Sequence, residues 1–309
     1  MIEVQDLTKK YGERTAVDGL SFTVEKGKIW GFLGPNAAGK TTTMRILTGY
    51  LPATDGRVRV SGLDVFEQAA EVKKMIGYLP EIPPLYPDLT VNDYLRFVAE
   101  LKQVPAASRK AAVDRAVEAT GLKEVRGRLI RNISRGFKQR VGIAQALIHD
   151  PLVLILDEPT IGLDPKQIIE IRQLIHSLRG QRTIIISTHM LAEVTQVCDG
   201  VIIINEGRLM ASGSLEELSR QLSEKQGVVL RTGKTLTAAE AQRIFGVAGV
   251  DRVTVSGDEI RLEWPKDQNL NELAARLAID NGLDLQEMRS LAMNIEDLYI
   301  KIISGGPER

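Results

Sequence analysis

Residues 34–43, GPNAAGKTTT, have the types and spacing needed to hold a chain of phosphates. They fit the pattern G-x-x-x-x-G-K-[ST] and stand between the apolar run of residues 29–33 and a helix-like segment. In such a loop, backbone N–H groups converge on phosphate oxygens, the lysine places its charge on the β- and γ-phosphates, and a hydroxyl ligates Mg²⁺. The sequence therefore predicts a nucleoside triphosphate site. The residues predicted to form it are Gly34, Pro35, Asn36, Ala37, Ala38, Gly39, Lys40, Thr41 and Thr42.

Two adjacent carboxylates supply the second piece of chemistry. Asp157 and Glu158 follow the aliphatic run of residues 152–156. A surface acidic pair rarely follows a run so apolar, because such a run is typical of a strand buried on both faces. Downstream of a phosphate loop, one carboxylate lies near Mg²⁺ and the other near the γ-phosphate. We therefore expect Asp157 to be a metal partner and Glu158 to be the base.

The pattern along the chain indicates which elements position these residues. The apolar runs 152–156 and 183–187 alternate with a helical segment, 166–178, which favours a parallel sheet covered on both faces. Alternating residues in 2–4 and 22–24 predict an antiparallel sheet at the start of the chain. From residue 90 the pattern is helical, and a helical subdomain is expected over about residues 82–149. The sequence thus predicts an α/β core with an antiparallel β subdomain and an inserted helical subdomain.

Composition and charge limit the function classes. The 309 residues include 40 basic and 40 acidic ones, so no global field favours nucleic acid, and we expect no nucleic-acid partner. The single Cys198 excludes a disulfide framework within the chain. Apolar runs are shorter than the roughly 20 residues of a spanning helix, and no secretory signal is seen at the start. We expect a cytoplasmic protein unless a partner holds it at a membrane.

These motifs together resemble the nucleotide-binding subunits of ATP-binding cassette (ABC) transporters. GPNAAGKTTT resembles the family's Walker A motif and LVLILDEP its Walker B motif. Residues 133–140, ISRGFKQR, stand where the signature LSGGQ-x-QR belongs, although Arg135 and Phe137 depart from it. The resemblance covers about residues 1–218 and has two further departures: Ala37 replaces a glycine of the loop, and Glu81 replaces the glutamine of the Q-loop.

The resemblance implies a P-loop NTPase fold, ATP and Mg²⁺ as cofactors, and a mechanism. Two copies would face each other head to tail, with each ATP between the Walker A motif of one and the signature of the other, and would drive a separate transmembrane permease. The further residues that the resemblance assigns are Tyr11 (base stacking), Thr41, Glu81 and Asp157 (metal), Ser134 and Gly136 (signature), Glu158 and His189 (catalysis), and Asp164 (link between the two sites).

The tail, residues 219–309, predicts a small C-terminal α+β domain. Its segments read in the order βαββαβ, which is the ferredoxin-like arrangement, and a closing helix is expected over residues 295–303. The tail resembles the C-terminal domain of exporter ATPases whose membrane domain is a separate polypeptide. By this resemblance the protein is peripheral on the inner face of the cell membrane.

Three functions remain open at the level of sequence. The first is an ATPase that drives a permease, in an exporter. The second is a soluble cassette ATPase that acts on DNA or on the ribosome, although the long coiled coil or second cassette of those proteins is not found in the sequence. The third is a motor or regulatory ATPase without transport. The sequence does not identify the transported substrate, because the membrane subunit selects it.

Overall fold

The structure is a computed structural model, and it describes residues 1–215, 217–218, 225–247, 249–265, 268–290 and 299. The chain divides into two units, Met1–Leu215 and Glu216–Arg309. The sequence pattern put this division at residues 218 and 219, and the role of each unit as a functional domain stays a prediction. No helix among the described residues has the length and hydropathy that crossing a membrane requires.

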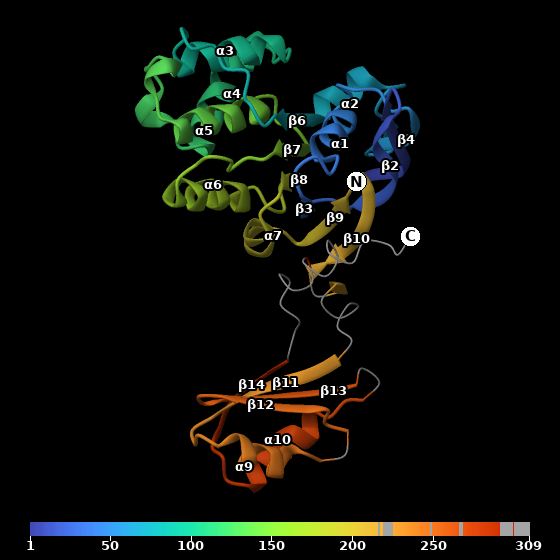
Figure 1. The fold of residues 1–309 in the computed structure, drawn as a ribbon. Coiled ribbons are helices and arrows are strands. Elements are labelled where there is room, and N and C mark those ends of the chain that lie inside the picture. Colours follow the sequence, from blue (N-terminus) through green and yellow to red (C-terminus); the bar gives the residue numbers. More distant parts are fainter. Residues whose placement is uncertain (216, 219–224, 248, 266–267, 291–298, 300–309) are drawn as a thin grey trace. The chain divides into compact units, whose positions relative to one another are not determined.

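The apolar runs of the first unit become the buried strands of its main sheet (Figure 1). The strands lie in the order β10-β9-β3-β8-β7-β6, and neighbours from β9 to β6 are parallel. Strand β10 is antiparallel to β9 because a two-residue turn joins them, which is too short for a parallel crossover. The expected parallel sheet therefore has an antiparallel edge. The bounds are β3 (Ile29–Leu33), β6 (Ile76–Leu79), β7 (Val153–Asp157), β8 (Thr183–Thr188), β9 (Gly200–Asn205) and β10 (Arg208–Ser214).

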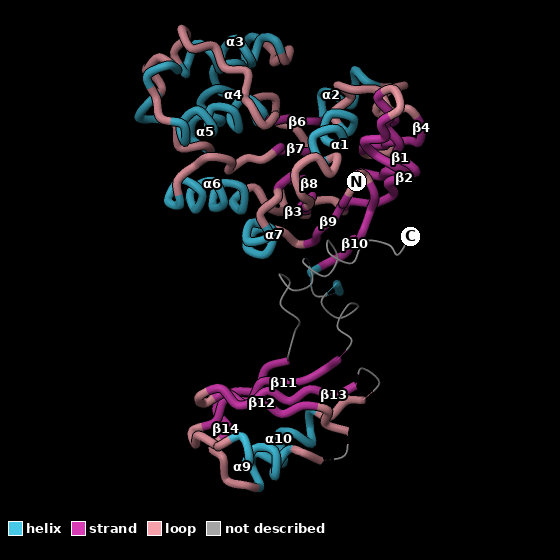
Figure 2. Tube along the Cα trace, in the orientation of Figure 1, coloured by secondary structure: helices cyan, strands magenta, loops and turns pink. Residues whose placement is uncertain are grey.

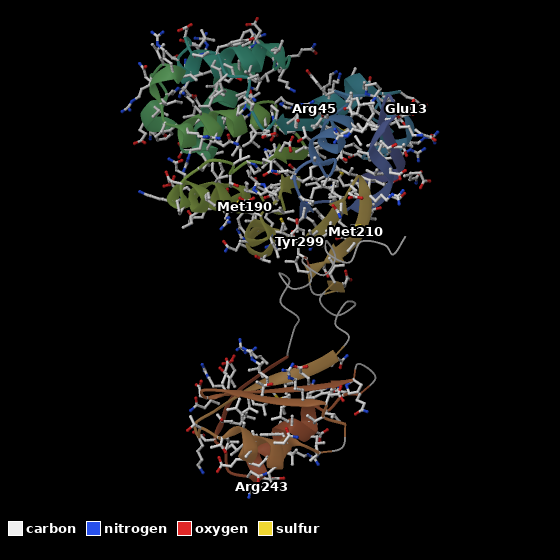
Figure 3. The ribbon with its side chains drawn as sticks, viewed as in Figure 1. Glu13, Arg45, Met190, Met210, Arg243 and Tyr299 are labelled. Carbon is white, nitrogen blue, oxygen red and sulfur yellow. The ribbon has the colours of Figure 1, made fainter. Side chains whose placement is uncertain are left out.

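Side chains alternate between the two faces of this sheet and bury helices on both. Val153 and Ile155 of β7 pack in the cluster that contains α1 (Lys40–Leu47) and the antiparallel sheet. Leu154 and Leu156 pack in the cluster formed with α5 (Arg135–Leu147), α6 (Pro165–Ser177) and α7 (Leu191–Val197). Full burial of each such side chain stabilises the fold by about 1.5–3 kcal/mol. Figure 3 shows the side chains as sticks on the ribbon.

A second, antiparallel sheet covers the α1 side of the core. Its strand order is β2-β1-β4-β5, as expected for an antiparallel β subdomain at the start of the chain. The residues Ile2 and Val4 of β1 face the core and alternate with the exposed Glu3. The bounds are β1 (Ile2–Tyr11), β2 (Arg14–Val24), β4 (Asp55–Val60) and β5 (Leu63–Asp64), with helix α2 (Ala69–Met75) after them.

Helices α3, α4 and α5 gather on the side of this unit away from β2 and β4 (Figure 1). They have a core of their own, with Tyr94, Leu95, Val117 and Val141 buried in one cluster. The Thr90 side chain accepts a bond from the Asp93 N–H at 3.1 Å and so caps α3. This is the inserted helical subdomain expected from the sequence. The further bounds are α3 (Val91–Leu101), α4 (Ala106–Ala119), and the 3₁₀ turns η1 (Lys123–Val125) and η2 (Ile130–Asn132).

The second unit has its own sheet and core. The strand order is β12-β13-β11-β14, each neighbouring pair is antiparallel, and α9 and α10 lie on one side of the sheet (Figure 2). The order of elements is the βαββαβ order that the sequence predicts, while membership of the ferredoxin-like class stays a prediction. Of the expected closing helix, residues 295–303, only Tyr299 is described. The bounds are β11 (Lys225–Thr232), α9 (Ala238–Phe245), β12 (Arg252–Ser256), β13 (Glu259–Pro265), α10 (Asn271–Asp280) and β14 (Leu285–Ser290).

Candidate functional site

The phosphate loop, residues 34–39, joins β3 to α1. At Gly39 the backbone has φ +101°, and a Cβ there would lie 2.6 Å from the Ala16 carbonyl oxygen, so only glycine fits. The Lys40 ammonium is buried and donates to the carbonyl oxygens of Gly34 at 2.8 Å and Pro35 at 3.1 Å. No side chain among the described residues caps the start of α1. Its first N–H groups and its positive dipole end are therefore available to an anion.

The hairpin formed by β9 and β10, at the edge of the main sheet, also supports the phosphate loop. The Gly207 N–H in the β9–β10 turn donates to the Ala38 carbonyl at 3.0 Å, and the Gly207 carbonyl accepts from the Asp18 N–H at 2.9 Å. The loop is thus bonded to a turn that lies far along the chain.

Strand β7 ends in the predicted acidic pair. Asp157 is fully buried; its Oδ1 accepts a bond from the Ser187 hydroxyl, and its Oδ2 has no partner among the described residues. Glu158 has a left-handed backbone with φ +47°, which costs a non-glycine residue about 1–2 kcal/mol. Its N–H donates to the Ser187 carbonyl at 3.0 Å and the Ser187 hydroxyl at 3.2 Å, which fixes this conformation. Ser187 of β8 thus holds the carboxylate of Asp157 and the backbone of Glu158 in place.

The Glu158 carboxylate joins two other predicted residues. Its Oε1 lies 3.3 Å from the Lys40 Nζ, and its Oε2 lies 2.9 Å from the His189 Nδ1. The Lys40 and Glu158 side chains are only 7% and 9% exposed, so little water screens this ion pair. His189 directly follows β8, and Met190, labelled in Figure 3, comes next and precedes α7. Strand ends that are adjacent in the parallel sheet therefore bring together a carboxylate, a cation and an imidazole.

A cleft of about 620 Å³ opens over this cluster. This volume lies within the range of small-molecule sites. Arg14, Ala16 and Ile161 also line the cleft and were missed by the sequence reasoning; only Arg14, a cation three residues after Tyr11, has a signal that could have revealed it. The predicted residues that line it are Tyr11, Asn36, Ala37, Gly39, Lys40, Thr41, Thr42, Glu81, Glu158 and His189.

Tyr11 lies at the end of β1 and its side chain is 47% exposed. The Lys9 ammonium lies 5.4 Å from the centre of the Tyr11 ring, a distance that allows a cation–π interaction. An exposed aromatic face on the cleft can stack on a base, as the sequence predicts.

The oxygen donors near the cleft fit a hard cation. Thr41 and Glu81 line the cleft, and the unpartnered Oδ2 of the buried Asp157 needs a positive partner. The pKa of Tyr78 is raised to about 12 by burial and, to a lesser extent, by the nearby charge of Asp157. No group of three or more His, Cys, Asp or Glu that could hold a metal occurs in the described residues. Mg²⁺ at these donors would therefore complete its shell with phosphate oxygens and water.

Seven predicted site residues are not part of the cleft lining: Gly34, Pro35 and Ala38 of the phosphate loop, Asp157 of β7, and Ser134, Gly136 and Asp164 at the starts of two helices. Ser134 caps α5, where its hydroxyl accepts from the Phe137 N–H at 3.3 Å. Asp164 caps α6 and accepts from the Gln167 N–H at 2.9 Å. Gly136 is buried, and a Cβ there would lie 2.7 Å from the Gln167 side chain. Within one chain, then, Ser134, Gly136 and Asp164 organise helix ends and do not approach the Lys40 cluster.

A second, more apolar groove of about 490 Å³ adjoins the cleft. Ile82, Pro83, Leu85 and Pro87 form much of its lining, and the Ile82 side chain is 82% exposed. Glu81 and Ile161 line both the groove and the cleft. The segment at residues 81–87 thus connects the two surfaces.

Known proteins are similar to this chain in sequence and in fold. The family described as "ABC transporter" matches residues 17–161. The chain is 36% identical to the bacitracin transport ATP-binding protein BcrA of Bacillus licheniformis, over 99% of this chain and 98% of that protein. It is 36% identical to the Nod factor export ATP-binding protein I of Ralstonia nicotianae, over 79% and 78% respectively. A solved ATP-binding subunit of an ABC transporter superposes with a TM-score of 0.65 at 29% identity, over 72% of this chain and 92% of that one.

Proposed function

Because the chain belongs to the ATP-binding subunits of ABC transporters, which bind and hydrolyse ATP, we propose that two copies close on ATP and drive a separate membrane permease in an exporter. The observation that carries this proposal is the convergence of Glu158, Lys40 and His189 at one end of the parallel sheet. It supports a site in which a carboxylate base stands beside the cation that binds phosphate.

In this proposal each residue of the site has its own role in ATP binding or hydrolysis. The loop N–H groups and Lys40 hold the phosphates, and Glu158 accepts the proton of the attacking water. His189 orients the Glu158 carboxylate and faces the cleft, where it can donate to the γ-phosphate. Thr41 and Asp157, with Glu81, would hold Mg²⁺, which neutralises charge on the phosphates. The Tyr11 ring stacks on the base of the bound nucleotide.

A second copy completes the site. Ser134 and Gly136 open the 13-residue helix α5, whose positive dipole end suits a γ-phosphate, but neither residue lies in the cleft of its own chain. In a head-to-tail homodimer these residues meet the ATP of the other copy, and Asp164 lies at the contact between the two sites. This arrangement explains why the signature residues and Lys40 are separate within one chain.

The apolar groove is the proposed docking site for the permease. An apolar floor with a polar rim suits a helix laid into a groove, and here Arg131 and Lys138 stand beside Ile82 and Leu85 in the lining. The names of relatives mention bacitracin transport and Nod factor export, which favours export over action on DNA or the ribosome. The protein would then lie in the cytoplasm on the inner face of the membrane. The transported substrate is left to the permease.

Crosslinking tests this docking site. Cysteine at Leu85 or at Tyr86 is expected to crosslink to a co-expressed permease, and cysteine at position 85 more strongly, because Leu85 lines the groove and Tyr86 does not. The native Cys198 will not interfere, since burial raises the pKa of its thiol. Ser256→Cys, on an exposed position of the second unit, is the comparison. Strong crosslinking at residue 256 with none at 85 or 86 would move the interface away from the groove.

Glu81→Gln tests whether residue 81 belongs to the metal shell. A full carboxylate charge strengthens binding to Mg²⁺ but repels metal-free nucleotide, so the variant is expected to keep ATPase activity, depend less steeply on Mg²⁺ concentration, and bind metal-free ATP more tightly. Titrations of Mg²⁺ and of metal-free ATP measure this. Glu13→Gln removes the same charge from an exposed residue outside the cleft lining and is the control. Identical curves for wild type and Glu81→Gln would place Glu81 outside the metal shell.

A further inference from the structure

The loop between β7 and α6, residues 158–164, begins at the base and ends at Asp164. Two turns shape it: the Ile161 N–H donates to the Glu158 carbonyl at 3.2 Å, and the Leu163 N–H donates to the Thr160 carbonyl at 3.2 Å. A displacement of Ile161 is therefore passed by one hydrogen bond to the backbone of Glu158. What holds Ile161 in place matters for the geometry of hydrolysis.

Arg135, at the start of α5, contacts the middle of this loop. Its Nη2 donates to the Ile161 carbonyl at 3.1 Å. A Cβ built on Gly162 would fall against the guanidinium carbon and both of its terminal nitrogens, and φ at Gly162 is +66°. Glycine at position 162 thus allows the positive φ of the backbone and leaves room for the Arg135 guanidinium.

The position of Arg135 is costly without this contact. A cation in the first turn of a helix opposes the helix dipole by about 0.3–1 kcal/mol. Serine at the cap and glycine at 136 follow the signature pattern, but arginine at 135 does not. The bond to the Ile161 carbonyl and the packing on Gly162 offset the unfavourable charge and give the side chain a defined place.

Arg135 also lines the apolar groove, together with Ile161 and Glu81. It is therefore the side chain that joins the start of α5, the 158–164 loop and the surface that a partner helix would contact. Ile161 itself lines the nucleotide cleft as well.

We propose that Arg135 is a positioning residue for ATP hydrolysis, which holds the 158–164 loop, and with it Glu158, from the wall of the apolar groove. The proposal rests on the proposed role of Glu158 as the base. Arg135 does not act on the nucleotide of its own chain, because it lies outside the cleft lining. Its loss changes the placement of the base and leaves the phosphate loop as it is.

The test compares three variants of the full-length protein in a steady-state ATPase assay. Arg135→Ala is expected to lower kcat about tenfold with the KM for ATP unchanged within about twofold, since a misplaced base slows chemistry and the binding residues are intact. Arg135→Lys keeps a donor within reach of the Ile161 carbonyl and is expected to recover more than half of that loss on a logarithmic scale. The thermal midpoint of the first unit should move by less than about 2 °C.

Lys166→Ala is the matched control. It removes a cation from the first turn of α6, at the other end of the same loop, and no hydrogen bond or ion pair of Lys166 with residues 158–164 is found in the described part of the chain. Its kcat should stay within about twofold of the wild-type value.

Several results would overturn the inference. One is a wild-type kcat for Arg135→Ala, and another is a lysine variant no better than the alanine variant. A KM raised severalfold would instead put the guanidinium on the nucleotide. Failure of the proposed function itself is distinguishable, because Glu158→Gln would then turn over ATP at the wild-type rate in the same assay.

Discussion

Glu158→Gln is expected to lower ATP turnover by about a thousandfold and to leave ATP binding intact. The amide keeps the size and shape of the side chain but cannot accept the proton of the attacking water, and loss of a general base costs about 10²–10⁴ in rate. Binding should be equal or tighter, because the carboxylate lies 3.3 Å from the Lys40 ammonium and competes with phosphate for it. With hydrolysis blocked, the ATP-bound homodimer should persist.

Three measurements check this expectation. Phosphate release gives the turnover, a fluorescent ATP analogue gives the affinity, and size-exclusion chromatography with and without Mg²⁺ and ATP gives the oligomeric state. Glu272→Gln, in a surface ion pair with Arg276 on α10, is the control for a glutamate exchanged elsewhere. Near wild-type turnover would exclude Glu158 as the base, whereas lost binding with lost turnover would indicate damage to the phosphate loop.

Lys40→Ala is expected to weaken ATP binding by about a hundredfold or more. Each charge-assisted hydrogen bond contributes about 1.5–3 kcal/mol, and the buried lysine is the cation that this loop offers to the phosphates. The substitution also leaves the Glu158 carboxylate, 9% exposed, without its cation partner. An uncompensated buried charge costs several kcal/mol, so the variant should also lose stability.

The two effects can be separated by a second substitution. Lys40→Ala combined with Glu158→Gln removes the unpaired charge, so the thermal midpoint should recover while the affinity for ATP stays low. Lys40→Arg should not restore binding, since a planar guanidinium does not reproduce the single ammonium that donates to the carbonyl oxygens of Gly34 and Pro35. Lys28→Ala, half-exposed at the surface, is the control. An affinity of Lys40→Ala within threefold of the wild-type value would contradict the role of Lys40.

Sequence reasoning succeeds where chemistry is local. The phosphate loop is a run of neighbours, and the acidic pair follows directly from its strand, so residue order alone predicts both. The contact of Glu158 with Lys40 and His189 needs the order β3-β8-β7, which depends on how strands pair and not on any one segment. The left-handed backbone of Glu158 has no signature in its residue type, because Ser187 of another strand imposes it.

The signature region shows where one pattern has two meanings. Ser134 and Asp164 were predicted to act in nucleotide binding, and within one chain they cap α5 and α6. A hydroxyl or carboxylate before a helix satisfies its first N–H groups, and the same N–H groups attract phosphate, so sequence cannot separate the two roles. Arg135 reads from the sequence only as a departure from a motif; its contact with Ile161 lies 26 residues away along the chain.

The bond between the Gly207 N–H and the Ala38 carbonyl bears on how the protein is made. Chains emerge from the ribosome with the N-terminal end first, and domains fold as units. Ala38 appears early, but the turn that supports its loop is synthesised only after the whole helical subdomain, β7, β8 and β9. A nascent chain therefore carries an unsupported phosphate loop until residue 207 is in place. We therefore expect affinity for ATP to be acquired late in translation, when the hairpin of β9 and β10 is in place.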